Sequence, residues 1–98
     1  MTGEAIDADR AERIGLLNAI APEGHALELA LAMARTIVAR APLGVRRAKE
    51  SVYRGWDQSL ADGLRTEMLL SCLLAGTADL QEGRAAFLER RPPEWTAR

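Results

Sequence analysis

Phe87, Arg90 and Arg91 are the residues of this 98-residue chain whose types and spacing best suit a chemical role. An aromatic residue with arginines three and four positions later places all of them on one face of a helix. A ring and a guanidinium can together stack on a purine and contact a phosphate. The structural alternative is a phenylalanine in the core, followed by two arginines that the helix dipole stabilises near the C-terminal end of the helix. The spacing alone is consistent with both.

His25 and Cys72 are the single histidine and the single cysteine. No carboxylate stands at a spacing that would orient His25 as a base, and no second histidine follows within a helical turn to share a metal. We therefore expect a solvated surface histidine and no metal site. Cys72 lies inside the apolar run Met68–Ala75, where a buried cysteine acts as a small hydrophobic residue with a raised pKa. The sequence predicts an inert core thiol.

Glu67 precedes that apolar run, and a carboxylate at the edge of such a face can have a raised pKa and act in acid–base chemistry. An ion pair or a hydrogen bond to a neighbouring helix end is the alternative. Arg46, Arg47 and Lys49 form a basic face that we expect to be solvated and offset by Glu50. None of the serines has the glycine-flanked turn of a nucleophile, and no glycine-rich phosphate loop is present.

The elements that must position these residues are helices, because helix caps and breakers recur and strand signals are nearly absent. An Asp7 cap and a Gly15 stop predict the first helix, and Ser59 with Asp62 resembles a capping box. The expected helices are Ala8–Arg13, His25–Arg40, Pro42–Arg54, Leu60–Ala75, and one from Thr77 or Asp79 to about Arg91, before a tail at Glu94–Arg98. The sequence predicts an all-α fold, a small bundle of four to five short helices. It allows one short extended segment at residues 16–20 (LLNAI), which needs a partner to be stable.

The apolar surface is larger than a bundle of this size needs. The chain is 48% hydrophobic but only 4% aromatic. His25–Arg40 carries two adjacent apolar stripes, which indicates burial on two sides, and Met68–Ala75 is apolar nearly all round. A chain of this length buries only about 60–65% of its unfolded surface. We expect part of this apolar surface to meet another body.

The overall charge excludes several function classes. Thirteen basic against fourteen acidic residues leave a formal net charge of −1, which gives no electrostatic basis for binding nucleic acid or an anionic membrane. A single cysteine excludes a disulfide framework. No run is long enough to span a membrane, and the first residues lack the pattern of a signal peptide. The sequence predicts a cytoplasmic protein with no nucleic-acid or membrane partner.

The order of these motifs resembles a known family. Residues 2–4 (TGE), 6–8 (IDA) and 15–18 (GLLN) are followed by Ala41-Pro42 with Lys49 downstream, and by Ser59-Leu60 with Glu67. The ending at residues 79–93, DLQEGRAAFLERRPP, resembles the D-x-x-E-G-x-x-A-F-x-E-K-R-x-P ending of the enoyl-CoA hydratase/isomerase (crotonase) family. The resemblance runs from Thr2 to about Trp95.

The resemblance implies that residues 1–98 form a single C-terminal helical and oligomerisation domain, with the family's N-terminal spiral catalytic core absent. It implies an acyl-CoA thioester as substrate of the full-length enzyme, no tightly bound cofactor, and trimers or hexamers. No residue here matches the catalytic acids or the oxyanion hole, so we expect no catalytic residue and no activity of the chain alone. By position, Phe87 and Arg90 would lie near the adenine end of CoA. Arg90 replaces the usual lysine, which retains the charge and alters the contact geometry.

The sequence is therefore consistent with two functions of different classes. The first is the C-terminal, oligomerising and CoA-contacting part of an enoyl-CoA hydratase/isomerase. The second is a stand-alone helical module that self-associates through the apolar arcs of His25–Arg40 and Met68–Ala75 and has no catalytic partner.

Overall fold

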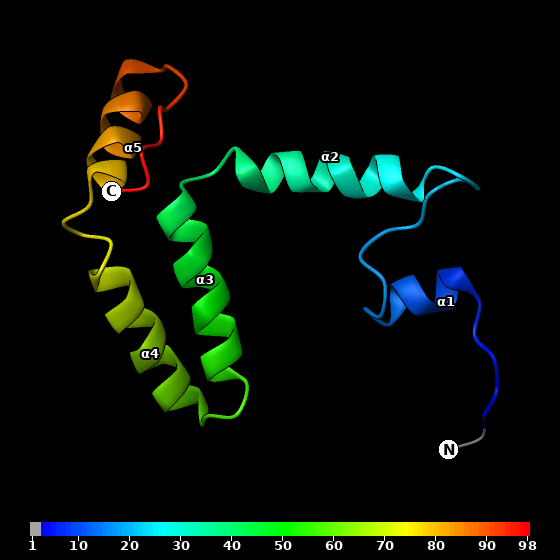
Figure 1. Cartoon of the computed structure of the whole chain (residues 1–98). Coiled ribbons are helices and arrows are strands. Elements are labelled where there is room, and N and C mark those ends of the chain that lie inside the picture. The colour runs from blue at the N-terminus through cyan, green and yellow to red at the C-terminus, as the bar shows by residue number, and fades with distance from the viewer. Residues whose placement is uncertain (1–2) are drawn as a thin grey trace. The chain divides into compact units, whose positions relative to one another are not determined.

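The structure is a computed structural model, and residues 3–98 are described; Thr2 of the family-like start lies outside the described residues. The described part contains five helices and no strand, which confirms the all-α prediction (Figure 1). In chain order they are α1 (Ala8–Arg13), α2 (Ala26–Val38), α3 (Pro42–Gly55), α4 (Leu60–Cys72) and α5 (Ala78–Glu89).

Local side-chain chemistry explains where the helices begin. Asp7 accepts a hydrogen bond from the Arg10 amide at 2.7 Å, which caps α1. At α4 the Asp62 amide donates to Ser59 Oγ at 3.2 Å, and the Ser59 hydroxyl donates to the Asp62 carboxylate at 2.6 Å. Gly15, after α1, has a φ of +78°, a conformation that glycine adopts without steric cost. The predicted caps at Asp7 and Ser59 and the stop at Gly15 are confirmed.

Four predicted segments differ from the structure. The helix predicted at His25–Arg40 is shorter, since α2 runs from Ala26 to Val38. Residues 16–20 form no strand, because an extended segment needs a hydrogen-bonded partner and the described chain supplies none. α4 ends at Cys72 instead of Ala75, and residues 73–76 form turns. α5 ends at Glu89 instead of about Arg91, because Arg90 adopts the left-handed conformation with a φ of 55°.

The chain divides into two compact units, one up to Arg35 and the other from Thr36 to Arg98. In the first, Ala11 of α1 is the buried residue, and none of the residues of α2 is buried. In the second, α3 and α4 form an antiparallel helical hairpin, followed by α5 and a C-terminal segment that folds back along it (Figure 1). The glycines Gly55 and Gly63 face each other across the hairpin and allow the two backbones to approach closely.

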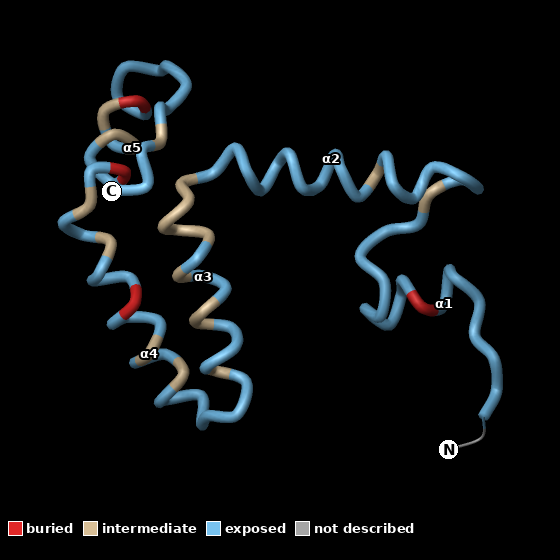
Figure 2. The backbone as a smooth tube through the Cα atoms, in the orientation of Figure 1, coloured by how far each residue is buried: buried red, intermediate tan, exposed pale blue. Residues whose placement is uncertain are grey.

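Few apolar side chains are buried (Figure 2). Among the described residues the buried apolar ones are Ala11, Leu70 and Ala86. Large exposed apolar side chains occur on several helices; they include Leu27, Val38, Met68, Leu69, Leu73, Phe87 and Leu88. The described chain thus exposes the surplus of apolar surface that the sequence predicts. The predicted burial of α2 on two sides does not occur within this chain, because α2 has no buried residue.

Cys72 is exposed, so the prediction of a buried core thiol is wrong for this chain. The apolar run around it suggested burial, but Met68, Leu69 and Leu73 are each about 60% exposed as well. An apolar run is buried only where another element covers it. Leu70 is the one residue of α4 that is buried, at 5% exposure.

Candidate functional site

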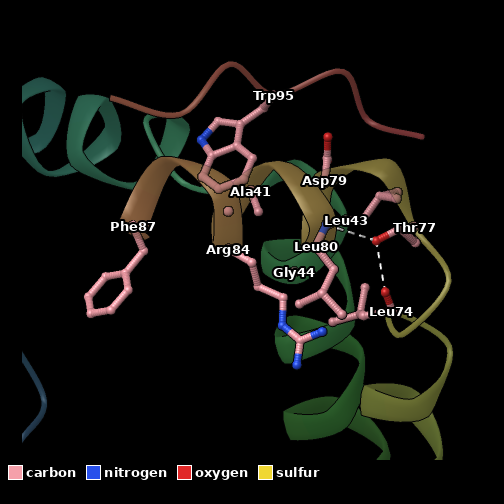
Figure 3. Close-up of a pocket in the computed structure, with 11 residues that line it drawn as sticks. Ala41, Leu43, Gly44, Leu74, Thr77, Asp79, Leu80, Arg84, Phe87 and Trp95 are labelled. Atoms are coloured by element: carbon pink, nitrogen blue, oxygen red, sulfur yellow. Dashed lines mark hydrogen bonds between the residues drawn. The ribbon is translucent and has the colours of Figure 1, made fainter. Parts of the chain in front are cut away.

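An apolar groove in the second unit lies beside Phe87, one of the residues singled out from the sequence. It lies between the start of α3 and one face of α5, with a volume of about 390 Å³ (Figure 3). Its apolar lining comes mainly from large side chains, namely Leu43, Leu74, Leu80, Phe87 and Trp95. Arg84 and Asp79 are the charged residues among its lining.

The C-terminal segment, residues 91–98, folds back along α5, and we refer to it as the C-terminal strap. Asp79, only 3% exposed, accepts hydrogen bonds from the amides of Thr96 at 2.8 Å and Ala97 at 3.1 Å. The Thr96 hydroxyl donates to the same carboxylate, and the Asp79 amide donates to the Arg98 carbonyl at 3.2 Å. These hydrogen bonds satisfy the Asp79 carboxylate, whose burial without partners would lower the free energy of unfolding.

Glu82, one turn further along α5, holds the other end of the strap. Its carboxylate accepts two hydrogen bonds from the Arg91 guanidinium, at 2.5 and 2.9 Å, and one from the Glu94 amide at 2.7 Å. The Arg91 hydrogen bonds, and then the Glu94 amide, lower the pKa of Glu82 to about 2 from its usual 4.5. Hydrogen bonds to Glu82 and Glu89 raise the pKa of Arg91. The strap is thus held at a paired, fork-like ionic contact.

Acidification is expected to release this end of the strap. A carboxylate whose pKa is lower in the folded than in the unfolded state stabilises the fold fully above the unfolded value, and the contribution is lost as pH falls through the folded value. For Glu82 that window runs from about 4.5 down to about 2. In a Trp56→Phe background, the fluorescence of Trp95 on the strap should change across this window. Glu82→Gln should show the low-pH signal at neutral pH. An unchanged titration in Glu82→Gln would contradict the assignment.

Trp95 connects the strap to the rest of the second unit. Its indole Nε1 donates to the Ala39 carbonyl at 3.0 Å, just before α3. Its ring packs on Gly83, where an added Cβ would meet the ring at 3.3 Å. A glycine at this position therefore leaves room for the indole to lie against α5.

Sequence reasoning missed this strap, since it treated residues 94–98 as a tail. The available signals were Asp79 and Glu82 one turn apart on α5, with Gly83 beside them and a tryptophan after two prolines. Acids near a helix N-terminus usually need no partner beyond the helix dipole. Their role as anchors became visible only from contacts across more than ten residues.

The structure does not place Phe87, Arg90 and Arg91 on one helix face, so that prediction is wrong. Arg90 has left the helix through its left-handed conformation, and Arg91 turns back to Glu82 and Glu89. Phe87 is 82% exposed at one end of the groove. Phe87 and Arg90 stay neighbours through the turn, where the Arg90 amide donates to the Phe87 carbonyl at 3.3 Å.

His25 lies on the surface as predicted, but it has an acidic partner. Its Nδ1 lies 3.1 Å from a Glu28 carboxylate oxygen, with both side chains mostly exposed. The prediction that no carboxylate stands at a spacing that would orient His25 is therefore wrong, because residues three apart on a helix are neighbours. Exposed pairs of this kind contribute little to stability.

The remaining candidates are on the α3–α4 hairpin. A second hollow, which we refer to as the hairpin groove, lies between α3 and α4 and is lined by Ala48, Val52 and Leu70 among others. Glu67 is exposed beside it, and within residues 3–98 its carboxylate has no hydrogen-bond or ion-pair partner. The basic face of α3 is offset by Glu50, as expected, which pairs with Arg47 at 2.7 Å and Arg54 at 2.6 Å. Lys49 lies 5.7 Å from the centre of the Tyr53 ring.

Among the described residues, no group of three or more histidine, cysteine or acidic side chains is arranged to hold a metal ion. No described helix has both the length and the apolar character required to cross a bilayer.

Solved enoyl-CoA hydratases contain this helical arrangement. The structure of an enoyl-CoA hydratase from Bacillus anthracis is 33% identical, with a TM-score of 0.92 over 99% of this chain and 38% of that one. An enoyl-CoA hydratase/isomerase from Mycobacterium paratuberculosis is 30% identical, with a TM-score of 0.91 over 99% of this chain and 38% of that one.

Sequence comparison gives the family. Residues 1–98 match the family model described as enoyl-CoA hydratase/isomerase, and this chain belongs to that family. The 2,3-dehydroadipyl-CoA hydratase of Escherichia coli K12 is 36% identical over 98 residues, which are 100% of this chain and 38% of that protein. The chain thus spans about a third of the length of the relatives that it matches, 38% for this hydratase and 32% for a probable mitochondrial enoyl-CoA hydratase of Arabidopsis thaliana.

Proposed function

We propose that this chain acts as the helical region of an acyl-CoA-processing enzyme of the hydratase/isomerase type. In this role it contributes to subunit association and to the nucleotide end of the CoA site, and none of its residues carries the bond-making step. The observation behind the proposal is a family match over the whole chain that spans about a third of the length of its relatives. The exposed apolar surface of α2 and α4 supports it, because such surface is stabilised by burial against another body.

Phe87 and Arg90 are the residues proposed to contact CoA. The Phe87 ring is 82% exposed and can accept an adenine by stacking. Arg90 is exposed, and its guanidinium has no ion-pair partner within residues 3–98, in contrast to Arg91. An unpaired guanidinium beside an exposed ring suits a phosphorylated purine nucleotide.

Substitution of either residue is expected to weaken CoA binding by the chain. Stacking of a base on an aromatic side chain contributes about 1–3 kcal/mol, so Phe87→Ala should raise the Kd for CoA at least about fivefold in titration calorimetry. Arg90→Gln should weaken binding of CoA more than binding of dephospho-CoA, which lacks one phosphate. Leu88→Ala, on an equally exposed neighbour, and Arg65→Gln should leave both titrations unchanged. Equal affinities for all four variants would exclude this site.

The stand-alone interaction module remains a second candidate function, favoured by the same exposed apolar side chains. It differs in one respect: it requires no affinity for CoA. Absence of CoA binding together with stable self-association would therefore favour the module over the enzyme part.

Self-association is expected in either case. Sedimentation of the chain over a wide concentration range should give a mass above that of the monomer. Leu27 in α2 is 71% exposed and Leu69 in α4 is 63% exposed. Leu27→Lys and Leu69→Lys place a charge on these apolar surfaces and should each raise the dissociation constant of self-association about tenfold or more. Leu88→Lys on α5, 80% exposed, is the matched control. A strictly monomeric wild-type chain would contradict both functions.

A further inference from the structure

Arg84 is a charged residue at the groove that neither the strap nor the proposed CoA contact uses. Its guanidinium has no ion-pair or hydrogen-bond partner within residues 3–98, and the side chain is exposed. The reason lies in its helix register. Positions three and four residues away on α5 are Leu80, Gln81, Phe87 and Leu88, so no acid is spaced to pair with it.

The groove beside Arg84 is apolar and of ligand size. Its volume of about 390 Å³ lies at the lower end of the range of about 300–1,000 Å³ typical of small-molecule sites. Figure 3 shows Arg84 extending from α5 next to Leu80, with Trp95 on the other side of the helix in this view. Leu43 and Leu74 complete the apolar wall.

Asp79 does not pair with Arg84. It lines the same groove, but its two oxygens accept hydrogen bonds from the Thr96 and Ala97 amides. The groove therefore presents an apolar wall with two charged groups: Asp79, whose oxygens are taken up by amides of the strap, and Arg84, whose guanidinium has no partner within residues 3–98. This combination is complementary to an aliphatic chain that ends in an anion.

We propose that this groove is a binding site for an aliphatic carboxylate. The chain of the ligand lies against Leu43, Leu74 and Leu80, and its carboxylate pairs with Arg84. A guanidinium matches a carboxylate with two parallel hydrogen bonds, which favours a carboxylate over a neutral head group. The site differs from the proposed CoA contact, because its ligand contacts Arg84, Leu43, Leu74 and Leu80 and uses neither Arg90 nor a nucleotide; Phe87, at one end of the groove, lies next to both.

Titration of the 98-residue chain with sodium decanoate, decanol and decylamine tests the site. Calorimetry and Trp95 fluorescence in a Trp56→Phe background give two readouts of binding. Decanoate should bind at least tenfold more tightly than decanol, and decylamine more weakly than either. Arg84→Gln should weaken decanoate binding about tenfold, which corresponds to about 1.4 kcal/mol, without affecting decanol.

Two variants sharpen the result. Arg84→Lys should recover part of the lost affinity, since it restores the charge without the fork geometry. Arg46→Gln, which removes an exposed arginine of α3 outside the groove, should behave as wild type. Equal affinity for decanoate and decanol, an unaltered Arg84→Gln titration, or no binding would each overturn the proposal. CoA titrations of Arg84→Gln should match wild type, so the outcome is separate from that of the CoA site.

Discussion

Asp79→Ala is expected to detach the end of the C-terminal strap and to lower the free energy of unfolding of the second unit by about 2–4 kcal/mol. Asp79 is 3% exposed and accepts hydrogen bonds from Thr96 and Ala97. Hydrogen bonds to a charged group contribute about 1.5–3 kcal/mol each, and the released amides recover part of this from water. Urea unfolding followed by circular dichroism measures the loss. Trp95 fluorescence in a Trp56→Phe background reports the detachment.

Matched substitutions distinguish the loss of the Asp79 hydrogen bonds from the loss of a negative charge alone. Asp79→Asn retains one acceptor oxygen and should have an intermediate effect. Asp57→Asn removes the same charge from an exposed position in the turn after α3 and should change stability by less than about 0.5 kcal/mol. If Asp79→Ala were as stable as wild type, with unaltered Trp95 fluorescence, the strap would not depend on this carboxylate.

Leu70→Ala is expected to have an effect of similar size for a different reason. Leu70 is 5% exposed on α4 and faces α3, where Ala48 and Val52 line the same part of the hairpin. Removing a buried leucine side chain costs about 2–5 kcal/mol, because transfer free energy is lost and a cavity is left. We expect the lower part of this range, because the hairpin groove is partly open to water. Thermal and urea unfolding measure it.

Leu69→Ala is the matched control for Leu70→Ala. The two leucines are adjacent in sequence, but Leu69 is 63% exposed. Its truncation should change stability by less than about 0.5 kcal/mol in the monomer. Similar losses for both variants would mean that the hairpin does not pack through Leu70.

Helix positions were predictable because their determinants are local. Asp7, Ser59 and Thr77 each cap a helix through a hydrogen bond to an amide three residues later, so the chemistry is contained in four residues. Gly15 ends its segment for a similarly local reason. The helix boundaries differ mainly at C-terminal ends, where no side chain fixes the last turn. Arg90 shows this, because a non-glycine residue rarely adopts the left-handed conformation that ends α5.

Burial was less predictable, because it depends on which elements meet. The wide apolar arc of α2 and the run around Cys72 indicate contact with another body, but the sequence does not say whether that body lies in the same chain. In the described structure Cys72 is exposed and α2 has no buried residue. Leu69 and Leu70 have the same side chain, and only the position of α3 decides which one is covered.

The sequence by itself determined the helical class, the caps and the family to which the chain belongs, because these follow from short motifs and from their order. The tertiary structure decided the use of Asp79 and Glu82 as anchors and the place of Trp95 against α5. The physical reason is that these properties depend on hydrogen bonds and contacts between residues that are distant in the chain. Such contacts form only once the backbone has turned back on itself after α5.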